Sequence, residues 1–345
     1  MKKIYCAICY FLLSSGFANV AGATETLRVL AWPGYVSNEA IRTFEAQHDV
    51  NVEVSFVNSD EELWSLASNK KGVSFDLMAV NTAELRRYVS AHLVIPIQLK
   101  NIPNTRKQTP RFRQLDAIPG IIQNGAPYAV PYTYSAMGLI YNRKLVSSAP
   151  RSMSAMWDPR YRNKVLAYHG GAHNFSLTAL MLGYHDPFHL SASQFTQVVK
   201  QLRDLRDNVL KFYSTPEEVV QLFRDNEVAL IYANYGDQQI QALQRAGADI
   251  GYAIPQEGAL AWLDCWAILR RSNNPELAEA WINFMLTPEV SGQLTLNEGL
   301  ANTLRDSPKP SMPDTGKLIW IQPVEDAAQR ELYWARIMSG APSKH

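Results

Sequence analysis

The chain has 345 residues, of which 47% are hydrophobic, 33 are Lys or Arg and 32 are Asp or Glu. This length allows one large domain or two medium ones, and the apolar content is sufficient for a buried core. The charges nearly balance, so there is no basic field of the kind that nucleic-acid-binding proteins carry, and no acidic tail.

The first residues have the pattern of a secretory signal peptide. Lys2 and Lys3 precede an apolar run over residues 4–13, and small residues lead to Ala23, after which we expect cleavage. The run is too short for a permanent transmembrane helix. We therefore predict a signal peptide over residues 1–23 and a periplasmic protein. Its single remaining cysteine, Cys265, cannot form an internal disulfide.

Strands and helices alternate after the signal peptide. The stretches TLRVLA, VNVEVSF and FDLMAV predict strands, and helices are expected over residues 38–47 and 83–91. Ser59, with Glu62 three residues later, predicts the start of a further helix between them. This alternation indicates a mainly parallel sheet that is covered by helices on both faces.

The same pattern recurs from residue 164, with strands in KVLAY, EVALIYA and IGYAIP and helices over 175–183 and 237–246. We therefore predict an α/β protein with two lobes: 24–131 with 258–302, and 132–257 with 303–345. The extended segments 128–142 and 250–264 should cross between the lobes as a hinge. Interfaces of this kind commonly hold ligands, and closure over a ligand would be a hinge motion.

The stretch EGALAWLDCWAIL, residues 257–269, places a charge in an apolar strand. Positions two apart on a strand share a face, so Trp262, Asp264 and Trp266 should point the same way. A carboxylate among apolar groups costs several kcal/mol unless it is paired. Asp264 is therefore expected either to bind a cation or to accept hydrogen bonds from a neighbouring backbone.

WPGY at 32–35, FDLMAV, and EGALAWLD followed by NFMLTPEV together resemble the periplasmic spermidine/putrescine-binding proteins, the substrate-binding components of ABC transporters. The likeness covers nearly the whole mature chain. It implies a type II-like two-lobe fold, a monomer without a cofactor, and a polyamine ligand. The membrane partner would be an ABC permease or, as for some relatives, a membrane sensor.

The resemblance also implies which residues contact the ligand. Asp264 would bind an ammonium group and Trp262 would pack on the methylenes, because aromatic faces attract cations and cover apolar carbons. The remaining positions are carried over from matching motifs, with Asp237 as a second acid and the last three as possible contacts: Trp32, Tyr35, Asn81, Tyr232, Asp237, His173, Gly34 and Gln322.

The resemblance is incomplete at the acidic positions. Gly34 stands where some relatives have an acid, Gly170 and His173 stand near two further expected acids, and Leu300 replaces a tyrosine. HGGAHNFS is a glycine-containing turn that leads into a helix, and helix N-termini bind anions. A zwitterion such as an amino acid or an aminophosphonate, with its ammonium at Asp264, is therefore an alternative ligand.

A metal enzyme is the remaining alternative. Four histidines lie within a short region as two pairs with a spacing of four, which would suit zinc on a helix. Glycines in the first pair and Pro187 in the second disfavour helices there, and no nucleophile, P-loop or dinucleotide motif is present. We expect no catalysis and no bound metal at His169, His173, His185 and His189.

Overall fold

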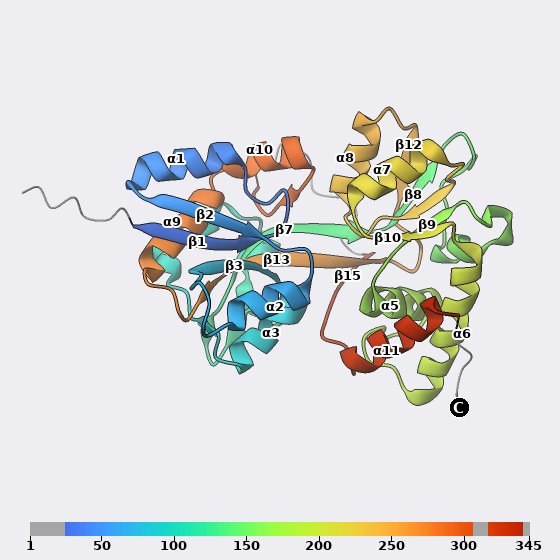
Figure 1. Cartoon of the computed structure of the whole chain (residues 1–345), viewed down its shortest axis with the longest axis horizontal. Coiled ribbons are helices and arrows are strands. Elements are labelled where there is room, and N and C mark those ends of the chain that lie inside the picture. The colour runs from blue at the N-terminus through green and yellow to red at the C-terminus, as the bar shows by residue number, and fades with distance from the viewer. Residues whose placement is uncertain (1–24, 306–316, 341–345) are drawn as a thin grey trace, which may run out of the picture.

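The computed structural model describes residues 25–305 and 317–340, which form two lobes that each surround their own sheet (Figure 1). The two-lobe α/β fold predicted from the sequence is therefore confirmed. The predicted signal peptide, residues 1–23, lies outside the described residues. Within the described ranges, no helix is long and apolar enough to cross a membrane.

The first lobe is built on a mixed sheet with the order β14-β7-β13-β3-β1-β2, to which β4 and β15 are joined through β13. The strands β1, β2 and β3 run parallel, as predicted, whereas β13 runs antiparallel to β3, β4 and β7 and parallel to β15. Its strands are β1 (Thr26–Ala31), β2 (Asn51–Phe56), β3 (Leu77–Asn81), β4 (Val94–Ile95), β7 (Val130–Met137), β13 (Ala259–Leu269), β14 (Ala301–Asn302) and β15 (Leu318–Trp320).

Helices cover both faces of this sheet because its strands are apolar on both sides. One face packs Phe44 and Trp281 against Trp266, and the opposite face packs Leu63 and Tyr88 against the sheet. The helices are α1 (Asn38–His48), α9 (Pro275–Met285) and α10 (Pro288–Glu298) on the first face, α2 (Asp60–Ser68) and α3 (Thr82–Ser90) on the second, and the short α4 (Pro110–Arg113).

The second lobe has a five-stranded sheet with the order β10-β9-β11-β8-β12. Helices α5, α6 and α11 cover one face and α7 and α8 the other (Figure 1). Its strands and helices are β8 (Leu139–Asn142), β9 (Val165–Tyr168), β10 (Lys211–Tyr213), β11 (Leu230–Tyr232), β12 (Ile250–Ala253), α5 (Gly171–Met181), α6 (Ala192–Asn208), α7 (Pro216–Asp225), α8 (Asp237–Arg245) and α11 (Ala327–Met338).

Short elements complete the described chain. They are the hairpin of β5 (Ile122–Gln123) and β6 (Ala126–Pro127) and the 3-10 helices Leu99–Asn101, Pro103–Lys107, Leu115–Ala117, Met153–Trp157 and Pro159–Tyr161.

Three segments cross between the lobes. The first runs from β7 to β8 through Gly138, the second from β12 to β13, and the third from β15 to α11. The Tyr252 hydroxyl ties the first two together, since it donates to Ala136 O at 3.0 Å and accepts from the Gly138 amide at 3.1 Å. A Cβ at Gly138 would lie 2.5 Å from Ala253 O, so only glycine fits this close approach.

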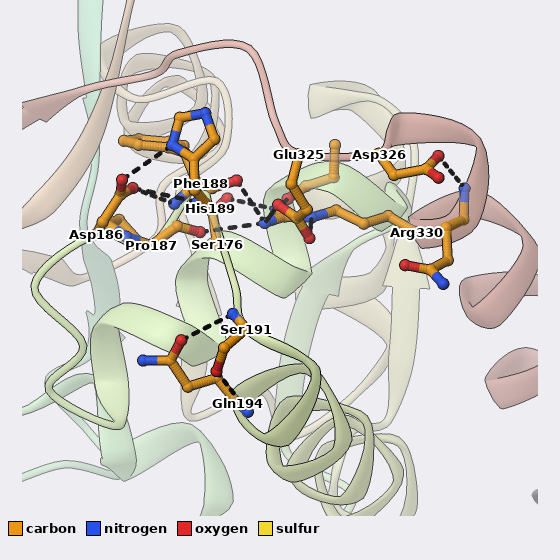
Figure 2. A network of polar contacts seen from close by, with 12 residues as sticks. Ser176, Asp186, Pro187, Phe188, His189, Ser191, Gln194, Glu325, Asp326 and Arg330 are labelled. Atoms are coloured by element: carbon orange, nitrogen blue, oxygen red, sulfur yellow. Dashed lines mark hydrogen bonds and ion pairs between the residues drawn. The ribbon is translucent and has the colours of Figure 1, made fainter. Parts of the chain in front are cut away.

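A buried arginine attaches α11 to the second lobe. Arg330 is fully buried, and its guanidinium binds Glu325 at 2.6 Å and 3.0 Å and Ser176 Oγ at 2.8 Å (Figure 2). It also donates to the carbonyls of Ala172 and Phe188. The planar fork of arginine can satisfy several acceptors at once, which makes its burial tolerable. Helix α11 is thereby fixed against the start of α5.

We expect Arg330→Met to lower the free energy of unfolding by about 3 kcal/mol, because Glu325 and the loop carbonyls would lose their donor while remaining partly buried. Arg160→Met, which removes a largely exposed partner of Asp158, should change it by less than about 1 kcal/mol. Chemical denaturation of both variants measures the difference. Equal values for the two would show that the Arg330 network does not hold α11 in place.

Candidate functional site

Polar and aromatic side chains of the first lobe gather at the carboxyl ends of its parallel strands. Trp32 directly follows β1, Asp60 begins the helix after β2, and Asn81 ends β3. Parallel strands end at the same edge of a sheet, and ligands of open α/β sheets bind outside that edge. The local cause at Asp60 is the predicted cap: Ser59 Oγ accepts from the Glu62 amide at 3.1 Å and starts α2 there.

The second lobe turns the corresponding strand ends toward the first. Tyr168 ends β9, and its ring lies 5.7 Å from His173 in the first turn of α5, measured between centroids. Tyr213, at the end of β10, and Tyr235, beyond β11, each lie 5.9 Å from the Tyr168 ring. The rings of Tyr168, His173, Tyr213 and Tyr235 thus form one aromatic wall in the second lobe, and Tyr213 is fully buried within it.

A cleft of about 410 Å³ lies between the lobes. Three predicted site residues, Asn81, His173 and Gln322, are in its lining. The lining also includes Asp60 and Glu84 from the first lobe and Ala172 and Ala327 from the second. A larger hollow of about 990 Å³, formed by segments 146–161 and 253–256, contains none of the predicted site residues.

Asp264 lies directly behind the cleft lining, because its Cα is paired with that of Asn81 where β13 meets β3. Only 6% of the residue is exposed. The Tyr35 hydroxyl donates to Asp264 Oδ2 at 2.6 Å. This contact brings two predicted residues together and makes Asp264 a hydrogen-bonded acid, with Trp262 and Trp266 on the same side of the strand, as predicted.

Burial raises the pKa of two acids of the first lobe, Asp264 and Asp60. The pKa of Asp264 is about 7, because loss of hydration outweighs the hydrogen bond from Tyr35. The pKa of Asp60 is raised well above its usual value by burial and then by the negative charges of Glu84 and Asp264. Asp60 also accepts from Asn81 Nδ2 at 3.0 Å, and Asn81 is the residue whose Cα pairs with that of Asp264.

Within the described ranges, neither Asp60 nor Asp264 forms an ion pair. The nearest guanidinium, that of Arg87, instead pairs with Glu84 at 3.5 Å and stacks 3.7 Å above the centroid of the Trp64 ring. Buried charges are normally paired or bound to a metal. A cation from outside the chain would therefore be strongly favoured beside these acids.

The indoles of the two tryptophans predicted as site residues, Trp32 and Trp262, are each held by a hydrogen bond to a backbone carbonyl. Trp32 Nε1 donates to Ala79 O at 3.1 Å, and Trp262 Nε1 donates to Asn234 O at 3.1 Å. Both indoles are half-buried, and Trp262 packs against the cores of both lobes. Its environment therefore depends on how the lobes are placed relative to each other.

The structure places Tyr232 away from the cleft. Its side chain is fully buried in the core of the second lobe, where the hydroxyl donates to Met137 Sδ at 3.4 Å. Asn234, two residues further on, contacts Trp262 and His173 instead. Sequence position alone could not separate these residues, because the chain turns directly after β11.

Asp237 and Gly34 lie at a different contact between the lobes. Asp237 begins α8, and its amide donates to Ser135 Oγ at 3.2 Å. A Cβ on Gly34 would lie 3.0 Å from Gln238 Nε2 of the same helix. Further along α8, Gln241 Nε2 donates to Leu296 O of α10 at 2.7 Å. An acid at position 34 would thus meet α8 directly.

His173 is a neutral member of the wall. Its Nδ1 lies 2.9 Å from Asn234 Oδ1, which can only accept, so the neutral ring carries its proton there. Burial lowers its pKa below the usual value. Asp264, with a pKa of about 7, is instead a group beside the cleft that titrates near neutral pH.

The other histidines have separate surroundings. His189 Nδ1 contacts Asp186 at 2.9 Å, and His169 packs on Trp334. Residues 25–305 and 317–340 contain no group of three or more His, Cys, Asp or Glu side chains that could hold a metal ion.

The start of α5, considered above as an anion site, is already next to a carboxylate. The Ala172 amide donates to Glu331 Oε1 at 3.3 Å, and this glutamate comes from α11. A ligand carboxylate at this position would meet a negative charge. This contact disfavours the zwitterion alternative in the form in which it was predicted.

Asp60, Tyr168 and Glu331 were missed by sequence reasoning. Asp60 was interpreted only as part of a helix cap, although an acid that directly follows a parallel strand is a signal for a site. Tyr168 ended a predicted strand and carried the same signal. Glu331 offered none, because only the tertiary packing of α11 brings it to the cleft.

Two α/β lobes, three crossing segments and a cleft between the lobes, lined by Asp60 and Glu84 and also by Arg86 and Arg87, are the architecture of a two-lobe solute-binding protein. The model of the bacterial extracellular solute-binding protein family matches residues 39–311. The chain therefore belongs to this family.

Relatives of the chain support the same class. It is 24% identical over 281 residues to the spermidine/putrescine-binding periplasmic protein of Salmonella typhimurium, covering 79% of this chain and 76% of that protein. It is 23% identical to the putrescine-binding periplasmic protein PotF of Escherichia coli (84% and 81% covered) and to the norspermidine sensor of Vibrio cholerae (79% and 72%). The TpPotD lipoprotein structure of Treponema pallidum superposes with a TM-score of 0.78 at 22% identity (91% and 99%).

We expect Asp264→Asn to stabilise the ligand-free protein at pH 8. The folded acid keeps its proton up to about pH 7, whereas the unfolded acid loses it near pH 3.8. This stabilising contribution is therefore complete below about pH 4 and is lost as the pH rises through 7. The amide of Asp264→Asn does not ionise. The variant should therefore exceed wild type in free energy of unfolding by about 2–4 kcal/mol at pH 8, and the difference should vanish near pH 4.

Thermal or chemical unfolding of both proteins at several pH values measures this difference. Asp76→Asn is the matched control, because Asp76 is equally buried but accepts from the Arg28 amide, Ser272 Oγ and the Asn273 amide. That variant should lose stability. An Asp264→Asn protein that is less stable than wild type at pH 8 would contradict the assigned environment of Asp264.

Proposed function

We propose that the protein binds a linear polyamine in the cleft between its lobes and presents it to a membrane partner. No bond is made or broken. The observation that carries this proposal is a pair of acids beside the cleft, the buried Asp264 and the half-buried Asp60, neither of which forms an ion pair within the described ranges. The names of the relatives, which include spermidine, putrescine and norspermidine binders, support it.

The chemistry of a protonated amine fits this site. An ammonium group donates three hydrogen bonds and carries a full charge, which the two carboxylates can share. Asp264 lies behind Asn81, so an amine would reach it as the lobes open and close. The charge–charge attraction would replace a proton with the ammonium group, because only the ionised acid attracts a cation.

Aromatic side chains would cover the methylenes between the charges. Trp32 follows β1, Trp262 lies on β13 and packs against the cores of both lobes, and Tyr168 ends β9 in the second lobe. Each ring that faces a cation contributes about 0.5–2 kcal/mol. This combination favours a flexible aliphatic amine over an inorganic cation.

The membrane partner is either an ABC permease, which would make the protein part of an importer, or a membrane sensor. The relatives include both kinds of protein, since one is named a norspermidine sensor. Neighbouring genes distinguish the two: permease and ATPase genes would support import, and a cyclic-dinucleotide enzyme or a histidine kinase would support sensing.

A calorimetric screen tests the ligand class. Diamines, spermidine and norspermidine should bind, whereas amino acids and aminophosphonates should not. Asp264→Asn and Asp60→Asn should each weaken amine binding by about 30- to 1000-fold, the effect of losing a charge-assisted contact in a desolvated site. Asp225→Asn, an exposed acid at the end of α7, should bind as wild type does. Unchanged amine affinity in Asp264→Asn would refute the proposed anchor.

Ligand should also change the intrinsic fluorescence, because Trp262 packs against both lobes and donates to Asn234 O across their junction. Trp262→Phe should remove most of the change. Trp157→Phe is the control, since that indole donates to Gln201 O within the second lobe. A full signal in Trp262→Phe would place the reporting indole elsewhere.

A further inference from the structure

Glu331 is a carboxylate on the second-lobe side of the cleft. Ala327, which lines the cleft, precedes it by four residues on α11, and residues with this spacing share one side of a helix. Glu331 Oε1 lies 3.3 Å from the amide of Ala172, another lining residue. Its carboxylate is therefore next to the cleft, and the side chain as a whole is exposed.

A glycine makes room for this carboxylate. A Cβ added at Gly171 would lie 2.5 Å from Glu331 Oε1 and 3.0 Å from Trp334 Cβ. Any larger residue at this position would push the carboxylate away from the start of α5. The Arg330 network described above fixes the neighbouring residue of α11, so Glu331 lies on a firmly attached turn.

Acidic side chains of both lobes lie near enough to Tyr168 to raise its pKa. Its hydroxyl experiences the negative charges of Asp60 and Glu61 from the first lobe and of Glu331 from the second, which together with burial raise its pKa. Acids of both lobes thus act on the same tyrosine, whose ring lies 5.7 Å from that of the lining residue His173. In the described ranges, Glu331 has no Lys, Arg or His within ion-pair distance.

We propose that Glu331 receives the distal ammonium group of the ligand, while Asp60 and Asp264 receive the proximal one. This inference rests on the proposed function and adds a requirement to it. The site would select amines with at least two cationic groups, because a monoamine leaves the Glu331 charge without a partner. Gly171 belongs to the same proposed subsite, because the absence of a side chain there leaves room for the Glu331 carboxylate.

Titration calorimetry with 1,4-diaminobutane, spermidine and butylamine tests this selectivity, with displacement titrations for weak ligands. Wild type should bind the two polyamines more tightly than butylamine. Glu331→Gln should weaken polyamine binding about tenfold and leave butylamine binding unchanged. Gly171→Ala should have the same selective effect, and the double variant should show no further loss, because both changes remove one contact.

The controls separate the two proposals. Asp225→Asn removes an equal charge from the second lobe and should have no effect, and Asp264→Asn should weaken all three ligands. If wild type binds no amine, the proposed function itself is wrong. If it binds amines through Asp264 but Glu331→Gln weakens all ligands equally or none, only the role of Glu331 is overturned. Unfolding curves of Glu331→Gln, whose altered side chain is exposed, should match wild type.

Discussion

The cost of burying Asp264 is the constraint on which the site depends. A carboxylate with 6% exposure and one hydrogen bond, from Tyr35, has a pKa raised to about 7, so about half of it is protonated at neutral pH without a cation. The negative charge of Asp264 also helps to raise the pKa of Asp60. In the empty protein, protonation avoids the cost of a buried charge. A cationic ligand stabilises the ionised acid and takes the place of the proton.

The fold supplies the geometry that this arrangement requires. Parallel strands bring Trp32, Asp60 and Asn81 to one edge of the first sheet, and β13 carries Asp264 across to meet them. The second sheet places Tyr168 and the start of α5 opposite. Arg330 attaches the last helix to that wall, so a residue near the end of the chain borders the cleft. The two halves are connected by the crossing segments and by contacts that include Gln241 with Leu296 O, Asp237 with Ser135 and Trp262 with Asn234 O.

Local patterns predicted much of this from the sequence. Alternating strands and helices gave the two sheets, and Ser59 with Glu62 located the start of α2 because capping depends only on neighbouring residues. The spacing of Trp262, Asp264 and Trp266 gave their shared side. The α5 helix begins at Gly171, earlier than predicted, because its first turn is stabilised by the distant Glu331 and Arg330. For the same reason Tyr232, whose environment is set by tertiary packing, and Glu331 could not be placed from the sequence.

The displacement of a proton by the ligand tests the central idea most directly. Spermidine binding at pH 6.5 should be measured calorimetrically in two buffers whose ionisation enthalpies differ. Amines are fully protonated at this pH, so a released proton must come from the protein. The buried acids predict release of roughly 0.5–1 proton per ligand in wild type and much less in Asp264→Asn. Binding with no dependence on the buffer, or with proton uptake, would contradict the view that an ammonium group neutralises Asp264.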